Sequence, residues 1–198
     1  MDPDAYLCQL AEIFNGISVN TPSLSAIIAI ILAGLLLLAS GFASASEIAF
    51  FSLSPSDLND IEEGNHPSDG KISNLLADSE RLLATILITN NFVNVTIIML
   101  CNFFFMNVFV FHSPLAEFLI LTVILTFLLL LFGEIMPKIY SAQKTLAFCR
   151  FSAPVIYMLR KVFAPISAVL VHSTAFLNKH FAKKNHNISV DERSEERR

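Results

Sequence analysis

Three apolar segments, each long enough to cross a lipid bilayer, constrain this chain more than any other feature of it. They run from about residue 24 to 51, from about 82 to 111 and from about 114 to 136. A helix needs about 20 apolar residues to span the hydrocarbon core of a membrane. Only 15% of the 198 residues are charged, whereas soluble domains carry about 25%. The sequence therefore predicts an all-α integral membrane protein with three transmembrane helices.

The region from residue 150 to 181 is apolar only in patches. Pro154 and Pro165 interrupt it, and Arg160 and Lys161 lie in its middle. An amphipathic helix, or a bent pair of helices in the membrane interface, accommodates charges that a span would not. We therefore predict juxtamembrane helices over residues 150–181 rather than a fourth span, following a three-span core over residues 24–149.

The basic residues indicate how the chain is oriented. All 13 lysines and arginines lie between residues 71 and 81 or from residue 138 onward. Three spans place every one of them on the same side, and the positive-inside rule makes that side the cytoplasm. Residues 1–23 are then expected outside, residues 52–81 form a cytoplasmic loop, and the charged residues 182–198 form a linker toward a further cytoplasmic domain.

The cytoplasmic loop contains the signals of two short helices. Ser54 and Pro55, followed by Asp57, are typical of a helix start, because serine caps the first turn and proline suits its first position. Gly64 or residues 65–70 would end this helix. A second short helix is expected from about Ile72.

The sequence Gly133-Glu-Ile-Met-Pro-Lys138 places polar groups at the end of the third apolar run. Pro137 has no N–H, so the carbonyl of Gly133, four residues earlier, loses its helical partner. The carboxylate of Glu134 lies beside this carbonyl, and two hard oxygen donors at membrane depth indicate a cation site. A local ion pair between Glu134 and Lys138, four residues apart, is an alternative explanation for both charges.

Two further polar clusters lie in the first two spans. Ser40, Ser44 and Glu47 are four and three residues apart and share one helical face. Close packing through small residues is the alternative explanation for the serines, but a carboxylate in a span needs a partner. The second span carries three asparagines within five residues, which favours ligands over hydrogen bonds between helices: Asn90, Asn91 and Asn94.

Together the clusters offer hydroxyl, amide, carboxylate and carbonyl oxygens. Hard all-oxygen ligation favours Mg²⁺ or Ca²⁺ over zinc or copper, and Na⁺ accepts the same ligands. With one or two carboxylates the affinity is modest, as transport requires. The three spans contain no histidine and the chain no Gly-x-Ser-x-Gly motif, so we do not expect an enzyme. No nucleic-acid partner is expected either.

The three clusters, in this order, resemble the transmembrane domain of the CNNM/CorC magnesium transporters. The matching stretches are Phe42-Ala-Ser-Ala-Ser-Glu47, Leu87-Ile-Thr-Asn-Asn-Phe-Val-Asn94 and Gly133-Glu-Ile-Met-Pro-Lys138. The resemblance implies a homodimer in the inner membrane of a bacterium, with a belt of juxtamembrane helices and a cytoplasmic pair of CBS modules. The phenylalanine-rich residues 103–105 also resemble a branch of the family associated with bacterial gliding motility.

Carried over motif by motif, the resemblance implies a dehydrated Mg²⁺ held among the three spans. It nominates the side chains of Ser44, Asn91, Asn94 and Glu134 and the main-chain carbonyl of Gly133. Asn90 remains an alternative to Asn91, because one helical step separates them. Structural or gating roles are expected for four further residues: Gly41, Glu47, Pro137 and Lys138. Tyr140 and Ser141 depart from the family's pattern, which has small apolar residues at these positions.

The function expected from the residues and the resemblance is secondary transport. We expect the domain to move Mg²⁺ outward, in exchange for Na⁺, with the helices bending at Gly41, Gly133 and Pro137. The alternative is a membrane scaffold that transports nothing and anchors a cytoplasmic regulatory module.

Overall fold

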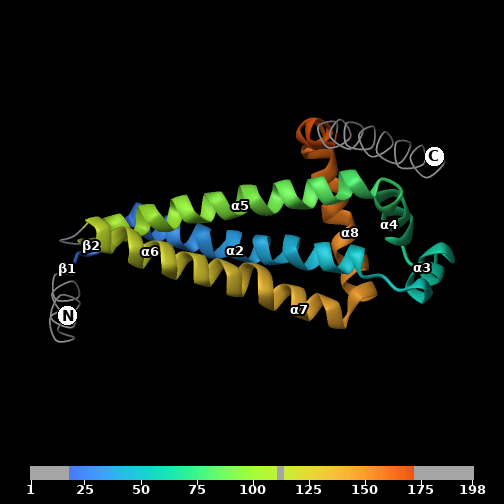
Figure 1. Cartoon of the computed structure of the whole chain (residues 1–198), viewed down its shortest axis with the longest axis horizontal. Helices are drawn as coiled ribbons and strands as arrows, with labels where there is room; N and C mark the ends of the chain where they lie inside the picture. The colour runs from blue at the N-terminus through green and yellow to red at the C-terminus, as the bar shows by residue number, and fades with distance from the viewer. Residues whose placement is uncertain (1–17, 111–113, 172–198) are drawn as a thin grey trace, which may run out of the picture.

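Three long helices lie side by side and form an elongated bundle (Figure 1). The first is α2 (Leu24–Phe51) and the second is α5 (Ser79–Val108). The third begins as α6 (Pro114–Leu128), continues through a π-helical segment, η1 (Leu129–Ile135), and ends as α7 (Met136–Gln143). All three are long and apolar enough to cross a membrane, so the predicted fold of three transmembrane helices is confirmed.

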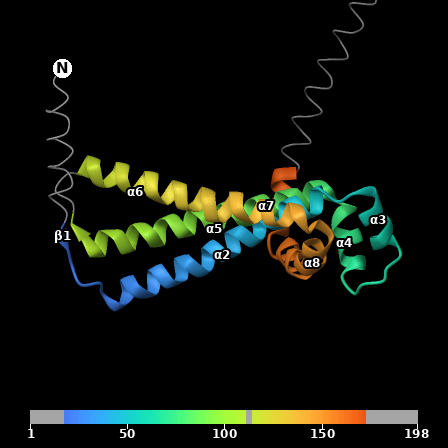
Figure 2. The same ribbon diagram turned by 90° about the horizontal axis from the view of Figure 1, so that it is seen from below.

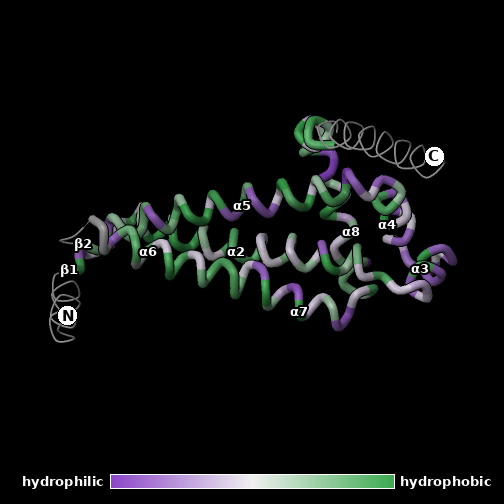
Figure 3. Tube along the Cα trace, in the orientation of Figure 1, coloured by the Kyte–Doolittle hydropathy of each residue, from purple (hydrophilic) through white to green (hydrophobic). Residues whose placement is uncertain are grey.

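The computed structural model describes residues 18–110 and 114–171. Most of the predicted N-terminal segment, the last part of the predicted juxtamembrane region and the predicted linker over residues 182–198 lie outside these ranges. Within the described residues, apolar side chains cover the outside of the spans, and hydrophilic positions gather at the end that carries the short helices (Figure 3). Leu38 is 72% exposed and Met99 68% exposed, as expected where side chains face lipid instead of a protein core.

A short β-ribbon closes the opposite end of the bundle. Strand β1 (Ser18–Val19) pairs antiparallel with β2 (Phe109–Val110). The N–H of Asn20 also donates to the carbonyl of Val108, at 2.7 Å. The ribbon therefore ties the segment that leads into α2 to the end of α5, a contact that the apolar pattern of the sequence does not signal.

The juxtamembrane helix α8 (Thr145–Val162) crosses the bundle instead of running along it. Figure 1 shows it nearly perpendicular to the three spans, and Figure 2 shows it nearly end-on. A second helix, Ala164–Val171, follows at a bend of 79°. The two together are apolar enough to count as a broken fourth span by composition alone. The crosswise orientation of α8 instead matches the predicted bent pair in the membrane interface.

Two details of the predicted juxtamembrane region are wrong. Its boundary at residue 150 falls inside α8, which begins at Thr145, and Pro154 does not interrupt the helix. A proline in a helix removes one hydrogen bond, and the packing of α8 against the bundle tolerates that loss. The break comes at Phe163, just before Pro165, where proline suits the first turn of the following helix.

The loop over residues 52–81 folds into the two predicted short helices, α3 (Pro55–Glu62) and α4 (Asp69–Leu76). Ser54 and Asp57 form a reciprocal capping box at the start of α3. After α3, Gly64 adopts a φ of 70°, a conformation that suits glycine. These helices pack against the ends of α2, α5 and α8 around a buried apolar core, which includes Phe50, Ile61, Ile72, Leu75, Leu82, Ile86, Cys149 and Ile156.

A bidentate ion pair joins the loop to the juxtamembrane belt. Nε of Arg150, on α8, donates to Oδ1 of Asp69 at 2.8 Å, and Nη2 donates to Oδ2 at 3.0 Å. The Asp69 side chain is fully buried, and that of Arg150 is 23% exposed. The guanidinium hydrogen bonds hold the pKa of Asp69 below its ordinary value of 3.8. The pair therefore favours the docked position of α4 on α8 whenever Asp69 is ionised.

We predict that Arg150→Gln lowers the thermal midpoint of the detergent-purified chain by roughly 5 °C or more, because a buried carboxylate loses its partner. The matched control is Arg81→Gln, since Arg81 pairs with Asp78 at the surface, at 3.5 Å and 45% exposed. Such surface pairs contribute little. Equal shifts in the two variants would show that the Asp69 pair does not hold α4 in place.

The same pair predicts a pH dependence. Because folding lowers the pKa of Asp69, its contribution is fully present above the ordinary pKa of 3.8 and is lost as the pH falls through the lowered value. Acid titration of thermal stability should therefore bring Arg150→Gln and the unaltered chain together below that pH.

Candidate functional site

Ser40 lies where the three spans meet, and its side chain is fully buried. Its Oγ is 2.9 Å from Oδ1 of Asn90 and 2.6 Å from Oδ1 of Asn94, both on α5. On the other side, a Cβ at Gly133 of η1 would lie only 3.2 Å from this Oγ. A hydroxyl has one proton and donates to one acceptor at a time. The Ser40 proton therefore serves only one of the two amide oxygens, and the other stays available to a ligand.

Ser44 lies one helical turn farther along α2. Its side chain is fully buried, and its Oγ has no hydrogen-bond partner among the described residues. A buried hydroxyl without a partner costs roughly 1–3 kcal/mol. By contrast, the nearby hydroxyl of Ser46 donates to the carbonyl of Phe42 in its own helix, at 2.7 Å. Ser44 therefore keeps an oxygen available to a ligand, and its role as a metal ligand stays a prediction.

The asparagines occupy two different faces of α5. Asn90 and Asn94, four residues apart, both contact Ser40. Asn91 is exposed and forms no hydrogen bond with the other nominated residues. The side chains of Ser40, Asn90 and Asn94 form a polar centre between the spans. Asn91 lies outside this polar centre, because the rotation of α5 and not the residue spacing decides which asparagine faces Ser40.

The π-helical register of η1 changes which carbonyl Pro137 leaves unpaired. The N–H of Met136 donates to the carbonyl of Leu131, five residues earlier. In that register the next acceptor is Phe132, whose donor would be Pro137, and proline has no N–H. The sequence pointed to Gly133 because an α-helical register was assumed. The Gly133 carbonyl as a ligand stays a prediction from the family resemblance, because the contact of Gly133 with Ser40 concerns its Cβ position and not its carbonyl.

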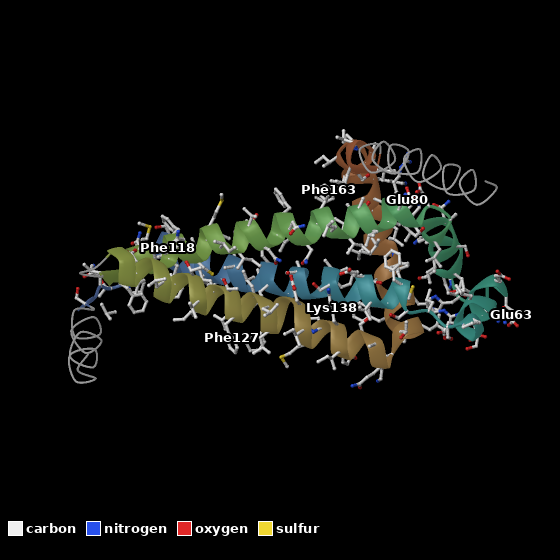
Figure 4. The ribbon with its side chains drawn as sticks, in the orientation of Figure 1. Glu63, Glu80, Phe118, Phe127, Lys138 and Phe163 are labelled. Carbon is white, nitrogen blue, oxygen red and sulfur yellow. The ribbon has the colours of Figure 1, made fainter. Side chains whose placement is uncertain are left out.

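The two charges of the Gly133–Lys138 stretch do not pair with each other. Lys138 contacts Glu47 of α2, with Nζ 3.1 Å from Oε2, and Figure 4 shows Lys138 on α7 beside α2. Glu134 is half-buried and has no hydrogen bond or ion pair among the described residues. The alternative explanation by a local Glu134–Lys138 pair is therefore wrong, because Lys138 pairs with Glu47 instead. Glu134 keeps a carboxylate without a partner among the described residues, next in sequence to Gly133.

Gly41 allows α2 to approach the third span closely. A Cβ at this position would lie 2.9 Å from Cγ of Pro137 and 3.3 Å from the carbonyl oxygen of Phe132. Farther along, the buried hydroxyl of Ser141 on α7 donates to the carbonyl of Ala45 on α2, at 2.6 Å. These contacts hold α7 against α2 on either side of the Glu47–Lys138 pair.

Sequence reasoning missed the importance of two serines. For Ser40, packing and ligation explained the residue equally well, and only its contacts with Asn90 and Asn94 place it at the centre. For Ser141, the signal was its departure from the family's pattern, and the structure explains it by the hydrogen bond to Ala45.

Within the parts of the chain that are described, no three His, Cys, Asp or Glu side chains gather. Any cation here would depend on hydroxyl, amide and carbonyl oxygens and a single carboxylate.

Three apolar helices that enclose a cluster of hydroxyl and amide oxygens define a multi-pass membrane domain with an internal polar site. Such a site is costly in a bilayer and usually functional.

Comparison with known proteins identifies the family. The family model described as the cyclin M transmembrane N-terminal domain (CNNM) matches residues 30–196, and the chain belongs to this family. A UPF0053 protein of Haemophilus influenzae (strain ATCC 51907 / DSM 11121 / KW20 / Rd) is 32% identical over 130 residues. The match covers 66% of this chain and 30% of that relative. The family resemblance inferred from the three clusters is thereby confirmed.

We predict that Gly41→Ala destabilises the bundle, since neither the ring of Pro137 nor the backbone of Phe132 can move away by side-chain rotation. Overpacking of this kind costs about 1–3 kcal/mol. The measurement is the thermal midpoint in detergent. Gly34→Ala, on the same helix, is the control, because a Cβ there would meet nothing within 4 Å. A midpoint unchanged by Gly41→Ala would mean that α2 and α7 do not pack this closely.

Proposed function

We propose that this domain binds a dehydrated divalent cation, Mg²⁺ above all, among its three spans and transports it across the membrane. The ligands proposed are the side chains of Ser40, Ser44, Asn90, Asn94 and Glu134, with the carbonyl of Gly133. The observation that carries the proposal is the convergence of the buried Ser40 hydroxyl with the side-chain amides of Asn90 and Asn94. The cyclin M family is generally linked to divalent cation transport, which supports the same conclusion.

The chemistry of the ligands supports a small, hard cation held loosely. Hydroxyl, amide and carbonyl oxygens suit Mg²⁺ and Ca²⁺ better than softer metals. Glu134 is the one carboxylate among the proposed ligands, so the total negative charge of the cation site is low. A low charge weakens binding, and a transported ion must leave as well as enter. Mg²⁺ gives up its water reluctantly, so dehydration is the step that the cage has to assist.

The contacts of α7 suggest which element moves. Beyond Pro137, α7 is held to α2 by the Glu47–Lys138 pair and by the hydrogen bond from Ser141 to Ala45. The π-helical segment before it has already departed from the α-helical register, and such segments are points where helices bend. We infer that α7 shifts against α2 when the cation enters, and that the ion pair re-forms when the site empties.

The setting of the domain follows from charge and family. From the positive-inside rule we propose that the α3–α4 end and α8 lie in the cytoplasm and the β-ribbon outside. We propose a homodimer in the inner membrane of a bacterium, carrying Mg²⁺ outward in exchange for Na⁺. We also propose that a cytoplasmic CBS pair follows in the full-length chain and regulates it.

A second candidate function is that of a membrane scaffold. It is favoured by the hydrogen bonds that Ser40 already forms with α5, because such bonds hold helices together without any ion. In that case the polar centre would stabilise the bundle, and transport would be absent.

The first test is the thermal stability of the purified chain against Mg²⁺, Ca²⁺, Mn²⁺ and Na⁺. We predict that Mg²⁺ at about a hundred times its Kd raises the thermal midpoint by roughly 5–10 °C, because it binds only the folded state. Glu134→Ala and Asn94→Ala should abolish this rise.

Asn91→Ala provides the matched control, since it removes the same amide from the exposed face of α5 and should keep the full rise. If no ion shifts the midpoint at millimolar concentration, the scaffold is the better explanation. Loss of the rise in Asn91→Ala alone would instead contradict the position of Asn91 in the structure.

A further inference from the structure

A largely apolar groove with a few polar side chains lies between α5 and α6, toward the end of the bundle that carries β1 and β2. Its volume is about 400 Å³. Phe118, marked in Figure 4 on α6, lies in its wall. The lining is otherwise apolar except for four polar side chains: Asn102, Glu117, Thr122 and Thr126.

Asn102, Thr122 and Thr126 are exposed on the surface of the bundle and Glu117 is half-buried. None of the four has a hydrogen-bond or ion-pair partner in the described parts of the chain. Glu117 is also the single charge between residues 115 and 132. Its position in the first turn of α6 lets the helix dipole favour the ionised carboxylate, but the dipole supplies no counter-ion. Glu117 is the first residue of the third candidate span, Glu117–Gln143. An ionisable group in a span is by default a candidate for a functional site.

The groove continues the line of amides that starts at the polar centre. Asn90, Asn94, Ile98 and Asn102 are each four residues apart and follow one ridge of α5. Asn94 contacts Ser40, whereas Ile98 and Asn102 line the groove. Eight residues of helix separate the two asparagines by about 12 Å along the axis.

The facing side of α6 offers a second set of oxygens. Thr122 and Thr126 are four residues apart, and both line the groove. Thr126 lies three residues before η1, the segment that carries Gly133 to the polar centre. The groove therefore lies farther along the helices that carry the Ser40 cluster, with Ile98 between Asn94 and Asn102.

We propose that this groove is an outward cation site in series with the inner one. A divalent cation that leaves the inner cage would be received by the carboxylate of Glu117, with Asn102 and the two threonines. These few oxygens cannot replace a full hydration shell, so the ion keeps part of its water here. A lipid chain would fill the groove but leave the carboxylate and the amide unpaired. The inference rests on the proposed function and adds an exit route to it.

The test is divalent-cation flux into or out of liposomes that contain the reconstituted chain, with Mn²⁺ as the probe. Glu117→Gln should lower the flux by about tenfold or more, since a tenfold change needs only about 1.4 kcal/mol. Asn102→Leu and Thr122→Val should also lower the Mn²⁺ flux, which keeps the test informative if one variant fails to fold.

Two control variants should keep the wild-type flux. Glu80→Gln removes a carboxylate from the first turn of α5, and Thr96→Val removes a hydroxyl that bonds only to its own helix.

Direct binding separates this inference from the function on which it rests. Electron paramagnetic resonance of free Mn²⁺ should show two sites per chain in the unaltered protein, and one after Glu117→Gln or after Asn94→Ala. A chain that neither binds nor transports the ion refutes the proposed function itself. Wild-type flux and binding in Glu117→Gln would overturn only the outward site. The outward site would also be overturned if Glu117→Gln kept both Mn²⁺ sites but eluted as a smaller particle in size-exclusion chromatography. The groove would then be a contact between copies of the chain.

Discussion

Polar groups inside a bilayer must find their partners within the protein, and the rest of this bundle depends on how Ser40 meets that demand. Its hydroxyl reaches two asparagines on α5 and lies against Gly133 of the third span. The contact is only feasible because Gly133 has no side chain there and because Gly41, next to Ser40, lets Pro137 approach. Two glycines and one serine thus set the distance between three helices.

The two ends of the bundle are held in different ways. At the α3–α4 end, a buried apolar core and the Asp69–Arg150 pair bind the loop helices to α8. At the other end, the described contacts include a two-stranded ribbon and a groove with unpaired polar groups. Buried contacts raise the free energy of local opening, and their scarcity lowers it. We therefore expect the third span, from the groove through the π-helical segment to α7, to move more easily than α8 and the loop helices α3 and α4.

Much of the fold could be predicted because it depends on local patterns. The lengths of the apolar runs gave three spans, the capping residues Ser54 and Asp57 located α3, and the three polar clusters identified the family. The site was predicted less completely. Ser44 and Asn94 were nominated, but Asn91 was preferred to Asn90, and Ser40 was given no special role. Each of these choices depends on which way a helix faces, and spacing along one helix does not reveal its partner.

The sequence by itself determined that the chain enters a membrane, how often it crosses, and which oxygens it can offer to a cation. These properties follow from composition and from the reach of a single helix. Only the tertiary structure decided which oxygens converge, that Lys138 pairs with Glu47 and not with Glu134, and that the carbonyl left unpaired by Pro137 belongs to Phe132. The physical reason is that helix rotation, register and ion pairing are set by contacts between spans, where several partners compete for each polar group.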